Sequence, residues 1–106
     1  MLNELKLLLG ITGDSRDELL KLLISTATAR LTMLLGGIAP PDSLDYIVRD
    51  VAIIRFNRIG SEGVESHTVD GESMSFSDDD FGQFKDDIQA FLDSQKESVR
   101  GKLRFL

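Results

Sequence analysis

The apolar residues of this chain recur at helical spacing in four segments, separated by glycine, proline and polar breaks. The first segment, Leu2–Leu9, ends at Gly10, which can adopt the left-handed conformation of a helix end. The second begins after Ser15, which has the capping-box spacing with Glu18, and its leucine-rich stripe continues to Gly36–Gly37. This pattern predicts a short leading helix followed by a long core helix.

The third helical segment follows a proline turn. Pro40–Pro41 cannot continue a helix, and Asp42 or Ser43 can cap the next one. From Leu44 to Asn57 the apolar residues cover a wide face, which is more than packing on one neighbour requires. We therefore expect this helix to be central.

The fourth helical segment begins at a cluster of acids. Ser77 is a capping residue, and Asp80 has the capping-box position three residues later. The helix is expected to run to about Lys96. Its apolar face consists of Phe81, Phe84, Ile88, Phe91 and Leu92.

Between the third and fourth helices the helical period disappears. Asp70–Gly71 is a dipeptide that favours a two-residue hairpin turn, which predicts short strands at 64–69 and 72–76. Neither face of this ribbon is hydrophobic enough to stand alone, so it needs a partner. The expected fold is mainly α: a small helical bundle of one short and three main helices, with a hairpin or loop protruding at 59–77.

The end of the chain, residues 97–106, is apolar and basic and has nothing local to pack on. We interpret it as a docking tail of a single 1–106 domain, the alternative being a frayed terminus. No leader peptide or membrane span is recognisable, so we expect the protein to stay in the cytoplasm in which it is made.

Composition narrows the chemistry. The chain has no cysteine and one histidine, His67, and its net charge of -6 argues against general nucleic-acid binding. A cation site at Asp78–Asp80, a general base at His67 and a phosphate loop at Gly60–Gly63 each lack the accompanying residues that such a site requires. We therefore expect no enzymatic activity, cofactor or metal.

The charge is unevenly distributed. Residues 59–84 contain seven acids and no Lys or Arg, whereas residues 96–106 contain four basic residues and one acid. This asymmetry indicates complementary contacts between chains or, equally, two solvated surfaces. Arg55 and Arg58, at the entrance to the acidic stretch, either bind carboxylates within the chain or reach across an interface.

At the centre of the chain the pattern N-R-x-G-x-E-G is followed by S-x-x-V-x-G-x-S-x-x-F. Together with the leading ELKLLLGI, this pattern resembles the small head-tail connector (adaptor) proteins of long-tailed bacteriophages. The residues that we assign to an inter-subunit or partner interface on this resemblance, called the motif residues below, are Arg55, Asn57, Arg58, Gly60, Glu62, Gly63, Ser66, Val69, Gly71, Ser73 and Phe76.

The resemblance implies a structural subunit of the virion neck, present in the host cytoplasm during assembly. It implies a ring of about a dozen copies beneath the portal protein, a closed assembly that stopper or tail-proximal proteins join. DNA would pass through the ring without sequence-specific binding. We expect a portal-docking tail formed by Lys102, Leu103, Arg104, Phe105 and Leu106.

A second class of function is compatible with the residues alone. A free-standing acidic helical regulator or partner-binding module would also be small, acidic and helical. It would require a contiguous acidic face rather than a ribbon shaped by glycines.

Overall fold

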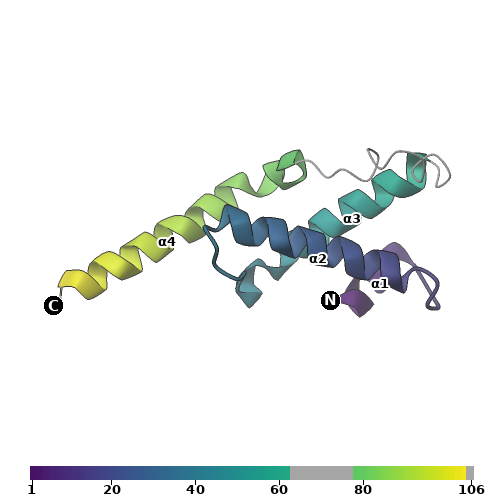
Figure 1. Cartoon of the computed structure of the whole chain (residues 1–106), viewed down its shortest axis with the longest axis horizontal. Coiled ribbons are helices and arrows are strands. Elements are labelled where there is room, and N and C mark those ends of the chain that lie inside the picture. Colours follow the sequence, from purple (N-terminus) through teal and green to yellow (C-terminus); the bar gives the residue numbers. More distant parts are fainter. Residues whose placement is uncertain (63–77, 105–106) are drawn as a thin grey trace.

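The structure, a computed structural model, describes residues 1–62 and 78–104, with side chains for 1–59 and 80–96. Within these ranges it is helical and contains no strand. Figure 1 shows α2 and α3 side by side, α1 against them, and the last helix leaving the bundle. None of the described helices is long and apolar enough to cross a membrane. The elements are α1 (Leu2–Leu9), α2 (Asp17–Leu34), η1 (Asp42–Leu44), α3 (Asp45–Glu62), η4 (Asp78–Phe84) and α4 (Lys85–Arg104).

The core lies between α2 and α3, the two helices that supply most of the buried apolar residues among those described. Leu20, Leu23 and Leu31 of α2 have no exposed surface, and neither do Ile47 and Val51 of α3. Each fully buried aliphatic side chain of this kind contributes about 1.5–3 kcal/mol. The prediction that α2 is a main core helix and α3 a central one is confirmed.

The leading helix α1 closes one end of this core. Leu5 is fully buried and packs with Leu23 and Ile59. At its end Gly10 has a φ of 70°, the left-handed conformation expected from the sequence. The Lys6 ammonium lies 2.8 Å from an Asp17 carboxylate oxygen, which ties α1 to the start of α2.

The predicted side-chain caps are not formed at the second and third helices. α2 begins at Asp17 with no side-chain cap, so the capping box of Ser15 and Glu18 is absent. α3 is preceded by the short 3-10 helix η1, whose N-cap residue is Pro41 rather than Asp42 or Ser43. A 3-10 turn at a helix start satisfies part of the free backbone donors locally, which reduces the need for a side-chain cap.

Two helices are longer than the sequence pattern indicated. α3 continues past Asn57 to Glu62, so the first residues of the expected hairpin or loop at 59–77 are its last turn. α4 continues past Lys96 to Arg104, so most of the expected docking tail is helical backbone. The predicted strands at 64–69 and 72–76, and the last two residues of the tail, lie outside the described residues.

The root of α4 is held on the bundle by aromatic residues. Phe81 and Phe84 of η4 are buried, and the Phe84 ring meets the Tyr46 ring edge-on with centroids 5.9 Å apart. The Tyr46 hydroxyl donates a hydrogen bond of 2.5 Å to the Asp87 carboxylate, and this bond raises the pKa of Tyr46. These contacts fix the direction in which α4 leaves the bundle.

Replacing Phe84 with alanine should remove the main contact between the α4 root and α3. Phe84 is 7% exposed, so we expect F84A to lower the free energy of unfolding by about 3–5 kcal/mol, measured by urea denaturation. L7A is the matched control, because Leu7 is 80% exposed and its truncation should change stability by less than about 0.5 kcal/mol. Equal effects of the two substitutions would contradict the packing described.

Candidate functional site: an arginine-aspartate cluster beside the motif segment

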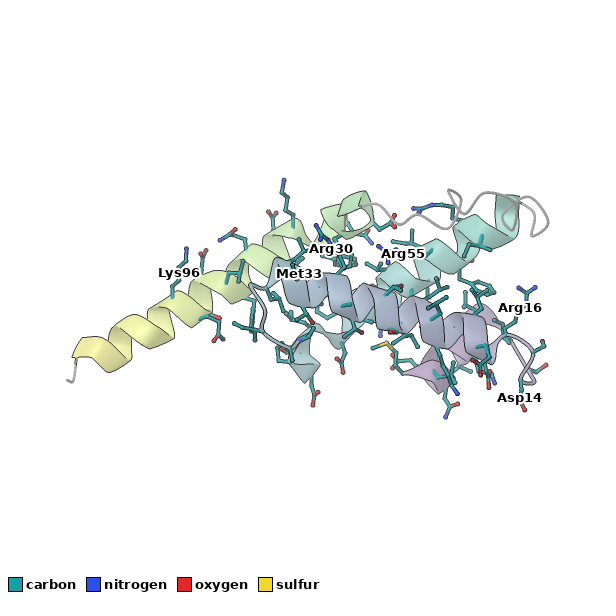
Figure 2. The ribbon with its side chains drawn as sticks, in the orientation of Figure 1. Asp14, Arg16, Arg30, Met33, Arg55 and Lys96 are labelled. Carbon is teal, nitrogen blue, oxygen red and sulfur yellow. The ribbon has the colours of Figure 1, made fainter. Side chains whose placement is uncertain are left out.

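A buried cluster of charges joins the end of α3 to η4. The Arg55 Nε atom donates a hydrogen bond of 2.9 Å to one carboxylate oxygen of Asp80. Arg58 donates from both terminal nitrogens, one to the same oxygen at 3.3 Å and the other to the second oxygen. Figure 2 places Arg55 between α3 and η4. We call Arg55, Arg58 and Asp80 the Arg-Asp cluster.

The three members of the cluster differ in their access to water. The Arg55 and Asp80 side chains are 2% and 4% exposed, whereas the Arg58 side chain is 35% exposed. Transferring a carboxylate out of water is costly unless its lone pairs are satisfied, and two guanidinium groups satisfy those of Asp80. Arg55 therefore acts inside the fold, and Arg58 connects the cluster to the surface.

The pKa of Asp80 reflects both its burial and its two arginine partners. Burial alone would raise the pKa, but the hydrogen bonds and charges of Arg58 and Arg55 outweigh burial, and the net pKa lies below its ordinary value of 3.8. Asp80 is thus held ionised in the folded protein at neutral pH. A protonated Asp80 would no longer offer its negative charge to the two guanidinium groups.

Phe81 completes the environment of Arg55. Its ring lies under the guanidinium group, with the carbon of that group 5.5 Å from the ring centroid. A cation over an aromatic face at this distance is attracted by the ring quadrupole. Two consecutive residues of η4 therefore hold Arg55, Asp80 by charge and Phe81 by its ring.

The members of the cluster lie on both sides of residues 63–77 in the sequence, which we call the motif segment. Arg55 and Arg58 precede residues 63–77, and Asp80 follows them, so the cluster holds together the two places where the described chain borders this segment. Fixing both ends of a connecting segment removes part of the conformational entropy that its ordering costs. Chemically the arrangement can anchor a segment, and it offers no activated nucleophile or base.

The predicted motif residues divide into three groups. Arg55 and Arg58 both bind Asp80, so they have the intrachain role, one of the two roles that the sequence left open. Asn57 is exposed on α3 beside them. Gly60 and Glu62 lie in the last turns of α3. The other predicted motif residues, Gly63, Ser66, Val69, Gly71, Ser73 and Phe76, lie outside the described residues, and their interface role stays a prediction.

The predicted docking tail is placed in part. Lys102, Leu103 and Arg104 belong to the last turn of α4, whereas Phe105 and Leu106 lie outside the described residues. Their role in docking stays a prediction.

Sequence reasoning missed Asp80 and Phe81 as members of the site. Asp80 was assigned to a capping box and Phe81 to the apolar face of the last helix. Two arginines precede residues 63–77 and three acids follow them, and this arrangement was the signal available in the sequence. Of those acids, the one adjacent to the buried aromatic residue is the one that the fold carries into the core.

Comparison with known proteins identifies one family. A family model described as Phage gp6-like head-tail connector protein matches residues 1–91. Searches of curated proteins and of solved structures give no match. The family match spans the Arg-Asp cluster and ends within α4, before its far half.

Substituting Asp80 with asparagine should destabilise the fold. Asparagine has a similar shape but no charge, so the two guanidinium groups lose the negative charge of Asp80, at a cost of about 3–5 kcal/mol for breaking a buried pair. The measurement is urea denaturation of D80N beside D86N, whose exposed carboxylate is the matched control. A D80N protein as stable as D86N would show that the cluster contributes little to the fold.

The free energy of unfolding should depend on pH through the ionisation of Asp80. Because its pKa is lowered in the folded state, its ionisation stabilises the fold above the ordinary value of 3.8, and this contribution is lost as the pH falls through the lower folded-state pKa. The difference in unfolding free energy between the wild type and D80N should therefore shrink on acidification. Denaturation from about pH 6 to pH 2 checks this, and a constant difference across that range would contradict it.

Proposed function

Because the chain belongs to the Phage gp6-like head-tail connector protein family, we propose that it is a structural subunit of the neck of a long-tailed bacteriophage. It assembles with other head and tail proteins as a ring of about a dozen copies beneath the portal, through which DNA passes. Stopper or tail-proximal proteins then join the ring. The family is one of structural connectors, not of enzymes.

The observation that carries this proposal is the family match over residues 1–91. It includes α1, α2, α3 and η4, which are the elements that position the motif segment. The matched range includes the motif residues Asn57–Gly63, and the motif is the place that we propose for the family's contacts. That place is the end of α3, where the Arg-Asp cluster is built.

The geometry supports a contact role for the motif residues. The cluster holds the base of the segment, while the neighbouring Asn57 is exposed and Arg58 keeps about a third of its side chain in contact with water. A partner arriving at this surface would meet side chains on a helix that is already ordered, which lowers the entropic cost of binding. Adjacent subunits or a neck protein are the partners we propose for this surface.

The end of α4 is the proposed portal-docking tail. Lys102 and Arg104 lie in its last turn, and Leu103 between them is apolar. Figure 1 shows this end of α4 projecting well beyond the bundle, so it is available to a second protein. The net charge of -6 would favour DNA sliding past the subunits over DNA binding to them.

Mixing the chain with the portal protein of the same phage tests this function. We expect rings on the portal by electron microscopy, and we expect deletion of residues 102–106 to reduce retention of the chain on the immobilised portal. The matched control carries glutamine at the exposed Lys85, which keeps the tail intact. A wild-type chain that gives no ring and no retention would refute the connector assignment, whereas undiminished retention of the deletion variant would refute only the tail.

A further inference from the structure

The last helix divides its charge along its length. From Lys85 to Asp93 it carries three acids and one basic residue, Lys85, whereas from Lys96 to Arg104 it carries four basic residues and one acid. The backbone of 85–104 is a single continuous helix. Because a helix is stiff over this length, the basic half cannot fold back on the acidic half of its own chain.

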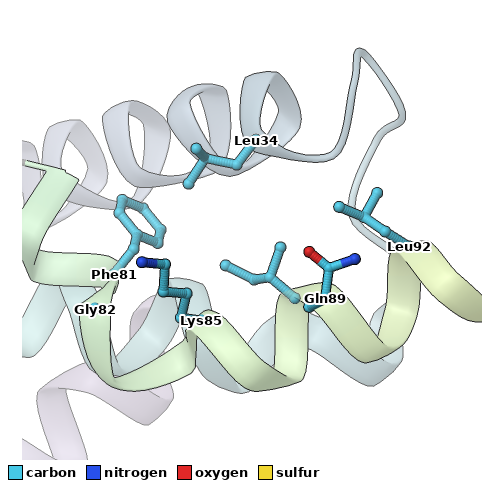
Figure 3. A pocket seen from close by; sticks show the side chains of 7 residues that line it. Leu34, Phe81, Gly82, Lys85, Gln89 and Leu92 are labelled. Carbon is cyan, nitrogen blue, oxygen red and sulfur yellow. The ribbon is translucent and has the colours of Figure 1, made fainter.

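The acidic half also borders an apolar groove. A cavity of about 390 Å³ opens between the end of α2 and α4, and its walls include Leu34, Phe81, Ile88 and Leu92 (Figure 3). Lys85 and Gln89 also line it, beside Phe81 and Leu92. Apolar walls of this kind gain free energy when another apolar surface displaces the water between them.

The basic half continues the face that lines the groove. With 3.6 residues per turn, positions 99 and 103 fall on the same helix face as positions 88 and 92. The sequence places Val99 and Leu103 there, and Lys96 and Arg100 at the flank. The backbone of this half of α4 projects beyond the other described helices (Figure 1).

We propose that α4 pairs with α4 of a second copy in antiparallel orientation, so that the basic half of each fills the groove of the other. Aligning position 88 with position 103 of the partner also aligns 92 with 99, because both pairs are four residues apart. The apolar positions of the two helices thus meet in one register. The two-fold axis falls between Gln95 and Lys96.

The same register brings opposite charges together. In an antiparallel pair, residues on one flank meet residues on the same flank of the partner. Asp93, which is exposed, shares that flank with the position of Arg100. Asp93 then comes within reach of the partner's Arg100. A parallel pair would instead place acids beside acids.

Pairing has a consequence for assembly that rests on the proposed function. Positions 102–104 belong both to the paired half and to the proposed portal-docking tail, so one contact excludes the other. Free subunits would keep their tails covered by each other, and the portal would replace the second copy. Self-association of the purified chain tests the pairing without any portal, so its result is independent of the connector assignment.

The first test is a charge swap followed by sedimentation over a wide range of protein concentration. D93R and R100D should each weaken self-association about tenfold, because two symmetry-related attractions become repulsions, and the double variant should restore it. High salt should weaken the wild-type pair. A wild-type chain that stays monomeric at its highest soluble concentration, or a double variant no better than the single ones, would overturn the proposal.

The second test uses the absence of native cysteine. Q95C places a thiol beside the two-fold axis, where its partner's thiol should be close enough for a disulfide. A90C is the matched control, because Ala90 is exposed and falls on the opposite face of α4. Under mild oxidation Q95C should give a covalent dimer and A90C should not. Equal dimer yields from the two variants would overturn the register.

Discussion

The place of η4 and of the α4 root on the bundle depends on the hydrogen bonds and charge attraction between Asp80 and two arginines of α3. Phe81, Phe84 and the α4 root add apolar contacts to the same junction. The carboxylate is buried and accepts from both Arg55 and Arg58, so its place is defined by direction as well as by distance. A hydrophobic contact alone would let η4 slide along α3, because burial of apolar area has no direction.

A buried charge cluster is an expensive way to hold two elements together. Removing Asp80 and Arg55 from water costs several kcal/mol for each buried ion, and an apolar core of the same shape is often as stable. What the cluster provides in return is a defined geometry of the two elements. The cluster stands beside the two borders of residues 63–77, so it ties the end of α3 to the start of η4 in one arrangement. A connecting segment with little apolar surface of its own needs such fixed ends, because it cannot be held by packing against the bundle.

The helical part of the fold was predictable because its signals are local. The stripes of α2 and α3, and the glycines at positions 10, 36 and 37, each act within a few residues, and the structure bears them out. The capping box at Ser15 was a weaker prediction and is not formed, since Arg16 is the N-cap residue of α2, whereas Ser77 lies outside the described residues. Asp80 shows the limit: its partners lie 25 and 22 residues earlier in the chain, and no local pattern distinguishes a capping acid from a buried one.

The far half of α4 lies beyond the family match. The parts of the chain within and beyond the match differ in what stabilises them. The part within the match is explained by its own core, since its apolar residues are buried by one another. The part beyond it has helical backbone, apolar positions at helical spacing and a net positive charge, and only its first turn, at Leu92, packs on the described core. An exposed helix of this length gains little stability from propensity alone, and most helices are stabilised by packing of one face. The acidic half of the same helix and the groove beside it supply a complementary surface in every other copy of the chain.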